Sequence, residues 1–237
     1  MAKNPENSNC NLETLLAVNK TYVEQFKLSS LIAFIQSPSV HDEHAQKTLL
    51  DCIQLFSDHF QKMITARYLT TEKTFFKKIA LEHFKEEFGH NELLLKDRNN
   101  EPPAWDPILD ATASWFIWKM IELDNIEKTF LMHLVLEASA NVFFSEADRV
   151  MQQYGITKYF SLHAEVDEDH ELMGLKLLEG LREQEYFYLF QTQKQGWEMI
   201  TAACDRIAKI IENSQMNPYR LKKKKQKIYN NVRWMTG

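Results

Sequence analysis

Apolar residues recur at a spacing close to 3.6 along almost the whole chain, which is the period of an amphipathic helix. Prolines, glycines and short polar clusters interrupt this spacing at a few places. We therefore predict an all-α protein with about seven helices, of which the first is a single helix or a broken pair. The predicted helices cover approximately residues 12–36, 43–69, 73–96, 108–122, 125–153, 157–182 and 186–213.

Two of the predicted breaks carry clear signals. The loop DRNNEPPAWDP before the fourth helix holds Pro102, Pro103 and Pro107, and proline favours loops and the first turn of a helix. Gly155 follows the fifth helix, at a position where glycine often ends a helix. No internal repeat is visible, which argues against a solenoid.

The composition indicates one globular unit. The chain has 237 residues, 44% of them hydrophobic, enough for one sizeable core. We assign residues 1–217 to a single helical domain and 218–237 to a basic C-terminal tail. Because no long apolar run is present, we expect neither a membrane span nor a signal peptide, and a cytoplasmic location. The three cysteines lack a CxxC pattern and are expected to be ordinary thiols.

Charge is unevenly distributed along the chain. The net charge is −5, yet the segment after Pro218 carries seven lysines and arginines and no acidic residue. An acidic body with a short basic tail is a poor nucleic-acid binder, so we expect no nucleic-acid partner. The tail itself is expected to be a solvated extension. The sequence leaves a homodimer open.

Histidines and carboxylates recur on the predicted helices. In EHFKEEFGHNELL of the third helix, Glu86 and Glu87 lie four and three residues before His90, so a carboxylate and an imidazole share one face. In HLVLEASANVFF of the fifth helix, Glu137 stands in an apolar run, and a buried carboxylate without a partner is costly. The plainer interpretation of the first motif is a solvated helix surface.

A third set, in YFSLHAEVDEDHELMG, is the most specific. His163, Asp167 and His170 are at positions i, i+4 and i+7, which fall within roughly 60° of one another around a helix axis. The alternative is an acidic solvated face, although the neighbouring carboxylates point to other sides. The remaining histidines are expected to be structural, at the surface or at helix ends for His41, His44 and His83 and in the core for His133.

Together with Asp58 on the second helix, these sets have the order typical of a carboxylate-bridged di-iron or di-manganese site in a helical bundle. Two divalent cations held close together need anionic oxygen ligands that neutralise and bridge them. Imidazole nitrogens suit iron. The sequence therefore predicts a two-metal site between the helices.

The motifs resemble those of the haem-oxygenase-like di-metal oxidases, especially the chlamydial members. YFSLHAEVDEDHE resembles the family's Tyr-Phe-x-x-His-x-Glu-x-Asp-x-x-His signature, FKEEFGHNELL its Glu-Glu-x-Gly motif, and LVLEASANVFF its central glutamate helix. The resemblance covers roughly residues 45 to 182. It implies a seven-helix haem-oxygenase-like bundle without haem, in which two Fe(II) ions, or manganese or a mixed pair, activate dioxygen. The ligands that it implies are Glu86 or Glu87, His90, Glu137, His163, Asp167 and His170.

The sequence departs from the family at two points. Gly89 and His90 adjoin, which leaves open whether Glu86 or Glu87 is the ligand. Many relatives also supply a glutamate from the preceding helix, where this chain offers only Asp58, His59 and Gln61.

The resemblance implies a non-haem di-iron oxidase or oxygenase that acts on a small organic substrate. Relatives catalyse N-oxygenation, oxidative decarboxylation, carbon–carbon cleavage and the formation of p-aminobenzoate from the protein's own tyrosine, for which Tyr22 is a candidate. Two alternatives remain, a metal-free enzyme like the thiaminase-type and quinone-cofactor members of the fold, and a non-enzymatic partner-binding protein. Candidates for the wall of the substrate pocket are Trp115, Trp118, Phe143, Phe144 and Phe160.

Overall fold

The computed structural model describes residues 10–155, 158–164 and 175–216, and every regular element in these ranges is helical. A π-helix, Leu131–Glu137, joins the α-helix that ends at Phe130 to the one that begins at Ala138 without a loop. Residues 158–164 are also helical. Short 3₁₀ turns occupy Pro38–His41, Gln152–Tyr154 and Leu175–Leu178. The α-helices are α1 (Leu12–Phe26), α2 (Ser30–Ile35), α3 (Glu43–Thr70), α4 (Thr74–Glu87), α5 (Asn91–Asp97), α6 (Pro107–Glu122), α7 (Asn125–Phe130), α8 (Ala138–Met151) and α10 (Glu183–Gln215).

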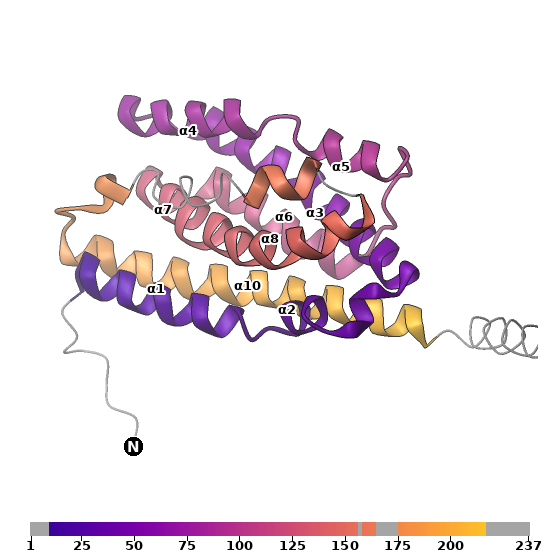
Figure 1. Cartoon of the computed structure of the whole chain (residues 1–237). Helices are drawn as coiled ribbons and strands as arrows, with labels where there is room; N and C mark the ends of the chain where they lie inside the picture. The colour runs from indigo at the N-terminus through magenta and orange to yellow at the C-terminus, as the bar shows by residue number, and fades with distance from the viewer. Residues whose placement is uncertain (1–9, 156–157, 165–174, 217–237) are drawn as a thin grey trace, which may run out of the picture.

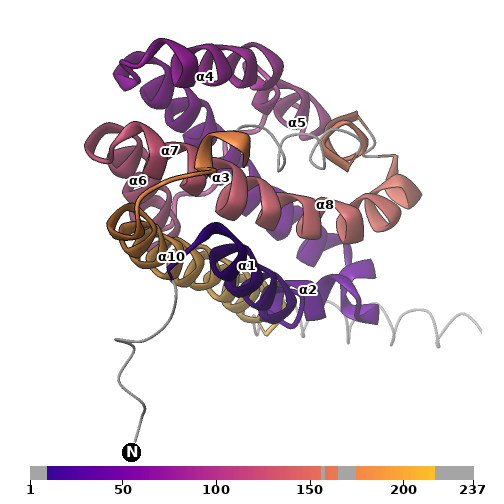
Figure 2. The same cartoon turned by 90° about the vertical axis from the view of Figure 1, so that its left-hand side faces the viewer.

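The helices form three layers. The long α10 lies along one side with α1 and α2 beside it, and α4 and α5 form the opposite side (Figure 1). Between them lie α3, α6, α7 and α8, as the view turned by 90° also shows (Figure 2). The helix α3 is central because it contacts α4, α5, α6 and α10. The structure therefore encloses its core between two outer layers, and α3 contacts both.

Local sequence explains where several helices begin. Asp42, Asp106 and Asp124 each accept hydrogen bonds from backbone N–H groups of the first turn that follows, at the starts of α3, α6 and α7. These contacts satisfy donors that a helix leaves without partners. Pro107 occupies the first turn of α6, where its missing N–H has no cost.

The predicted all-α class is confirmed, and so is the break in the first helix, which separates α1 from α2. The predicted continuous helix 73–96 is wrong, because it breaks at Gly89, whose φ of +92° is left-handed. The predicted end of the sixth helix at residue 182 is also wrong. A 3₁₀ turn occupies Leu175–Leu178 and Gly180 has a φ of +67°, so the chain has left the helix before α10 begins. In the part of the chain that the structure describes, none of the helices is long and apolar enough to cross a membrane.

Candidate metal centre

The break between α4 and α5 places two of the predicted ligands. Glu87 is the last residue of α4 and His90 directly precedes α5. The side-chain amide of Gln61, on α3, bridges the break: its Nε2 donates to the carbonyl oxygen of Glu87 over 3.1 Å and its Oε1 accepts from the N–H of Gly89 over 2.8 Å. These are backbone groups that the end of a helix leaves unpaired, so Gln61 fixes the backbone on both sides of the turn.

Glu87, His90 and His163 converge from three different elements. The Nδ1 atom of His90 lies 3.1 Å from Glu87 Oε2, and the Nε2 atom of His163 lies 3.6 Å from the same oxygen. One donor atom from each residue lies within 4.8 Å of the others. Such a group of one carboxylate and two imidazoles is suited to iron, manganese or zinc.

The ring of His163 is held in one orientation. Its Nδ1 lies 2.7 Å from the carbonyl oxygen of Tyr159, which can only accept, so Nδ1 carries a proton and Nε2 is the ring nitrogen directed toward Glu87. Phe144 stacks on the same ring, with centroids 4.6 Å apart. An anchored Nδ1–H is the usual arrangement of a metal-binding histidine.

Glu87 is held as a carboxylate. Burial would raise its pKa, but the hydrogen bonds from His163 and His90 outweigh burial, and the pKa lies below its usual value. The charged form is the one that binds cations.

Glu137 lies in a second polar corner, which is fully buried. Its Oε1 lies 2.9 Å from Nε2 of His83, and Nδ1 of His83 lies 3.3 Å from Nη1 of Arg67. Because a guanidinium can only donate, His83 accepts at Nδ1 and donates from Nε2 to Glu137. Burial lowers the pKa of Arg67 to about 9, and the charge of Glu137 partly offsets this effect.

The π-helix sets the position of Glu137, which is its last residue. Two contacts support this irregular segment. Asn19 donates from Nδ2 to the carbonyl oxygen of Leu134 over 2.8 Å. The long helix α10 approaches at Gly196, where an added Cβ would lie 2.6 Å from Cδ1 of Leu131. Short π-helical segments occur frequently at functional sites.

The other candidate ligands are distributed differently. Glu86 is exposed, whereas Glu87 is buried, so only Glu87 belongs to the three-residue group. Asp167 and His170 lie outside the described residues. Asp58 accepts from Gln54 and Asn91, each over 2.8 Å, and therefore anchors the start of α5.

Three further histidines were considered in the sequence. His59, one of the residues available on the second helix, contacts Asp110, with Nε2 and Oδ1 3.0 Å apart. The prediction that His83 lies at the surface or caps a helix is wrong, because its side chain is fully buried. His133 is buried beside His83, as expected of a core histidine.

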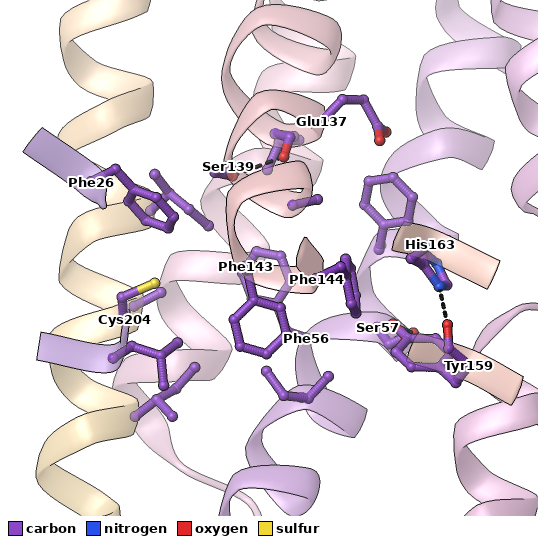
Figure 3. A pocket seen from close by; sticks show the side chains of 18 of the residues that line it. Phe26, Phe56, Ser57, Glu137, Ser139, Phe143, Phe144, Tyr159, His163 and Cys204 are labelled. Atoms are coloured by element: carbon purple, nitrogen blue, oxygen red, sulfur yellow. Dashed lines mark hydrogen bonds between the residues drawn. The ribbon is translucent and has the colours of Figure 1, made fainter. Parts of the chain in front are cut away.

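A cavity of about 100 Å³ adjoins both corners, since Glu87, Glu137 and His163 line it together with Phe143 and Phe144. Figure 3 shows Glu137 and His163 on one side of the cavity and Cys204 on the other.

Of the aromatic residues predicted for the pocket wall, Phe143 and Phe144 line this cavity, whereas the two tryptophans and Phe160 do not. Trp118 is exposed and Trp115 packs edge-on against Phe116. Phe160 packs against Phe143 behind the wall. Tyr22 stacks on Trp197, with centroids 6.1 Å apart, and does not line the cavity.

Comparison with known proteins places the chain in a family. No family model matches it. It is 33% identical over 199 residues to the uncharacterized protein RP592 of Rickettsia prowazekii (strain Madrid E), a match that covers 84% of this chain and 95% of that protein. The chain belongs to the RP592 family. The alignment spans almost the entire Rickettsia protein, so the RP592 family shares the domain as a whole.

A solved structure identifies the fold of this RP592 family member. It resembles the crystal structure of a domain of unknown function with a heme oxygenase-like fold from Shewanella denitrificans OS217, with a TM-score of 0.64 and 14% sequence identity. The match covers 87% of this chain and 95% of that one. The predicted haem-oxygenase-like fold is therefore confirmed.

Sequence reasoning missed Arg67 and His83 as parts of the site, and it named Gln61 as a residue available on the second helix without its contacts to the backbone at Glu87 and Gly89. One signal was available for His83, which lies four residues before Glu87 and therefore on the same face of α4. Arg67 and Gln61 are polar residues within α3, and nothing in their local sequence separates them from surface positions.

Proposed function

We propose that this protein is a non-haem di-iron oxidase or oxygenase that uses dioxygen to oxidise a small organic substrate held in the cavity. The observation that carries the proposal is the convergence of Glu87, His90 and His163 within 4.8 Å. The anchored ring of His163 and the lowered pKa of Glu87 at the same point support it.

The donor set suits iron. Glu87, His90 and His163 would hold one ion, and Glu137 would contribute to the second, with Asp167 and His170 completing the set that the sequence predicts. Manganese or a mixed pair has the same ligand preferences. When bound, the metal pair supplies the electrons that reduce dioxygen.

The chain's own residues prepare the site. Gln61 holds the backbone on both sides of the Glu87–His90 turn, and the carbonyl of Tyr159 fixes the His163 tautomer. His83 bonds to one oxygen of Glu137, which fixes the orientation of the carboxylate. Phe143 and Phe144 exclude water from the space where a substrate would lie.

The test is anaerobic loading with Fe(II), desalting and measurement of metal content, followed by dioxygen uptake. We expect about two irons per chain in the native protein. The variant Glu87→Gln should lose most of the metal, because an amide cannot replace the carboxylate charge. As a matched control, Glu82→Gln removes an exposed carboxylate from the same helix and should leave metal content unchanged.

Two further variants in the same experiment test which residues are metal ligands. Glu86→Gln separates the adjacent glutamates, and we expect it to retain metal because Glu86 is exposed. Asp167→Ala tests the histidine-rich motif and should lose metal. No retained metal in the folded native protein would contradict the proposal and favour a metal-free acid–base enzyme. Metal retained without dioxygen uptake would favour a non-enzymatic binding role.

A further inference from the structure

The acidic and basic side chains of the cavity beside the candidate metal centre lie at one end. Glu87, Glu137 and His163 are the acidic or basic side chains among the described residues that line it, and neither lysine nor arginine is among them. In Figure 3, Glu137 and His163 lie on one side, with Phe56, Phe143 and Phe144 in the middle. Any charged group of a ligand would therefore find its partners at that side alone.

The opposite end is apolar and comes from α1, α2 and α10. Its most polar atom is the sulfur of Cys204. Burial raises the pKa of this thiol, and the nearby Asp205 raises it further, so the group stays neutral at physiological pH. The described residues that these three helices contribute to the lining are Phe26, Leu31, Ile200, Ala203, Cys204 and Ile207.

The size of the cavity limits the ligand. A cavity of about 150 Å³ lined by leucine, isoleucine and phenylalanine holds one benzene molecule. The volume here is about 100 Å³, which suits an apolar group of roughly four to five carbon atoms. A long fatty chain would not be enclosed.

We propose that the substrate has a short, uncharged, apolar body of roughly four to five carbon atoms, which fills the cavity toward Cys204 and directs its polar group toward Glu87, Glu137 and His163. The role of this ligand as the substrate rests on the proposed function. Binding itself does not, because the apolar end of the cavity contains none of the candidate ligands. A charged distal group is excluded, because burial of an ammonium without a partner costs many times the thermal energy.

The first test compares two probes of equal length that share a hydroxyl at one end. These are 1-pentanol and 5-amino-1-pentanol, titrated into the full-length protein with and without Mn(II) and followed by protein NMR shifts. We expect saturable binding of 1-pentanol and at least about tenfold weaker binding of 5-amino-1-pentanol. Equal affinity of the two probes, or no saturable binding of 1-pentanol, would overturn the proposal.

The second test fills the cavity from α10. Ala203 is buried and lines the apolar end, whereas the adjacent Ala202 is exposed. We expect Ala203→Leu to weaken 1-pentanol binding at least about tenfold and Ala202→Leu to leave it within about twofold. If Ala203→Leu does not fold, Ala140→Val narrows the cavity from α8. Unchanged binding in the folded cavity variant would place the ligand elsewhere and refute the proposal.

The comparison of titrations with and without Mn(II) distinguishes a failure of this proposal from a failure of the proposed function. If Mn(II) is not retained but 1-pentanol binds in a manner that depends on Ala203, the metal site fails and the ligand class stands. If Mn(II) is retained and 1-pentanol does not bind, the ligand class fails alone. With both bound, the paramagnetic ion should broaden the hydroxymethyl protons more than the terminal methyl protons, and the reverse order would contradict the proposed orientation.

Discussion

Two polar clusters adjoin one cavity, and their acidic side chains have different partners. The first corner consists of Glu87, His90 and His163, and the second corner consists of Glu137, His83 and Arg67. Glu87 meets two histidines, and one of them, His90, has a side chain that is 19% exposed. Glu137 is enclosed with His83 and the cationic Arg67, all nearly inaccessible to solvent. In the first corner, a carboxylate lies beside two imidazoles and no arginine or lysine among the described residues contacts it in an ion pair. The second already contains its own counter-charge.

Because of this difference, we expect the two corners to have different roles. A metal that enters the first corner would replace the hydrogen bonds between Glu87 and the two histidines with metal–ligand bonds, since carboxylate oxygens and imidazole nitrogens are ligands of iron and manganese. At the second corner, the Arg67–His83 pair holds Glu137 in place before any metal arrives. The first corner should therefore govern whether metal binds, and the second should govern stability and the orientation of one further ligand.

The largest effect should come from removal of the buried cation. Arg67→Met leaves the carboxylate of Glu137 without its facing charge in an enclosed site, so we expect a loss of about 3 kcal/mol in the free energy of unfolding, measured by urea denaturation of the metal-free protein. Arg149→Met, at an exposed arginine, should change stability by less than about 0.5 kcal/mol. Equal effects of the two variants would remove the contrast between the corners.

Metal should stabilise the protein through the first corner. At a Mn(II) concentration of about one hundred times Kd, binding to the folded state alone adds about 2.7 kcal/mol to the free energy of unfolding. We expect Glu87→Gln to abolish this gain. His83→Gln should keep part of the gain, because a glutamine can still donate to Glu137, although it starts from lower stability. Calorimetric melting curves with and without Mn(II) measure both. A full gain in Glu87→Gln would show that the first corner is not the metal site.

A variant of α10 tests the π-helix that supports the second corner. In Gly196→Ala, the new Cβ would lie 2.6 Å from Cδ1 of Leu131 and 3.1 Å from Cγ1 of Val135, and we expect about 2 kcal/mol of destabilisation from the forced shift. The double variant with Leu131→Ala should show a favourable coupling energy, since the smaller side chain makes room. Additive losses would mean that α10 does not restrain this segment.

The sequence was informative for the first corner and much less so for the second. Helical period and turn residues predict the all-α bundle, and a three-residue spacing brings Glu87 and His90 together even though the helix between them breaks. The break itself depends on Gly89 and on hydrogen bonds from Gln61, a residue 28 positions away. The second corner joins residues 67, 83 and 137 through a π-helix. An extra residue in a helical turn leaves no periodic signal that differs from ordinary helix, so the contact with Arg67 and His83 could not be predicted.

The smallest predicted effect on stability concerns Gln61, which bridges the turn of the first corner. Gln61→Leu removes two hydrogen bonds to backbone groups, so we expect a loss of about 1 to 2 kcal/mol in stability. Its effect on metal should be larger, roughly tenfold to a hundredfold in Mn(II) affinity by calorimetric titration, since Glu87 and His90 lose their fixed separation. Gln61→Glu keeps the acceptor for Gly89 and should recover part of the affinity. Gln153→Leu is a control, because the amide of Gln153 bonds only to an exposed carbonyl among the described residues. If Gln61→Leu lowered stability but left metal affinity at the native value, Gln61 would support the fold alone, and the order of the first corner would have to come from the histidines themselves.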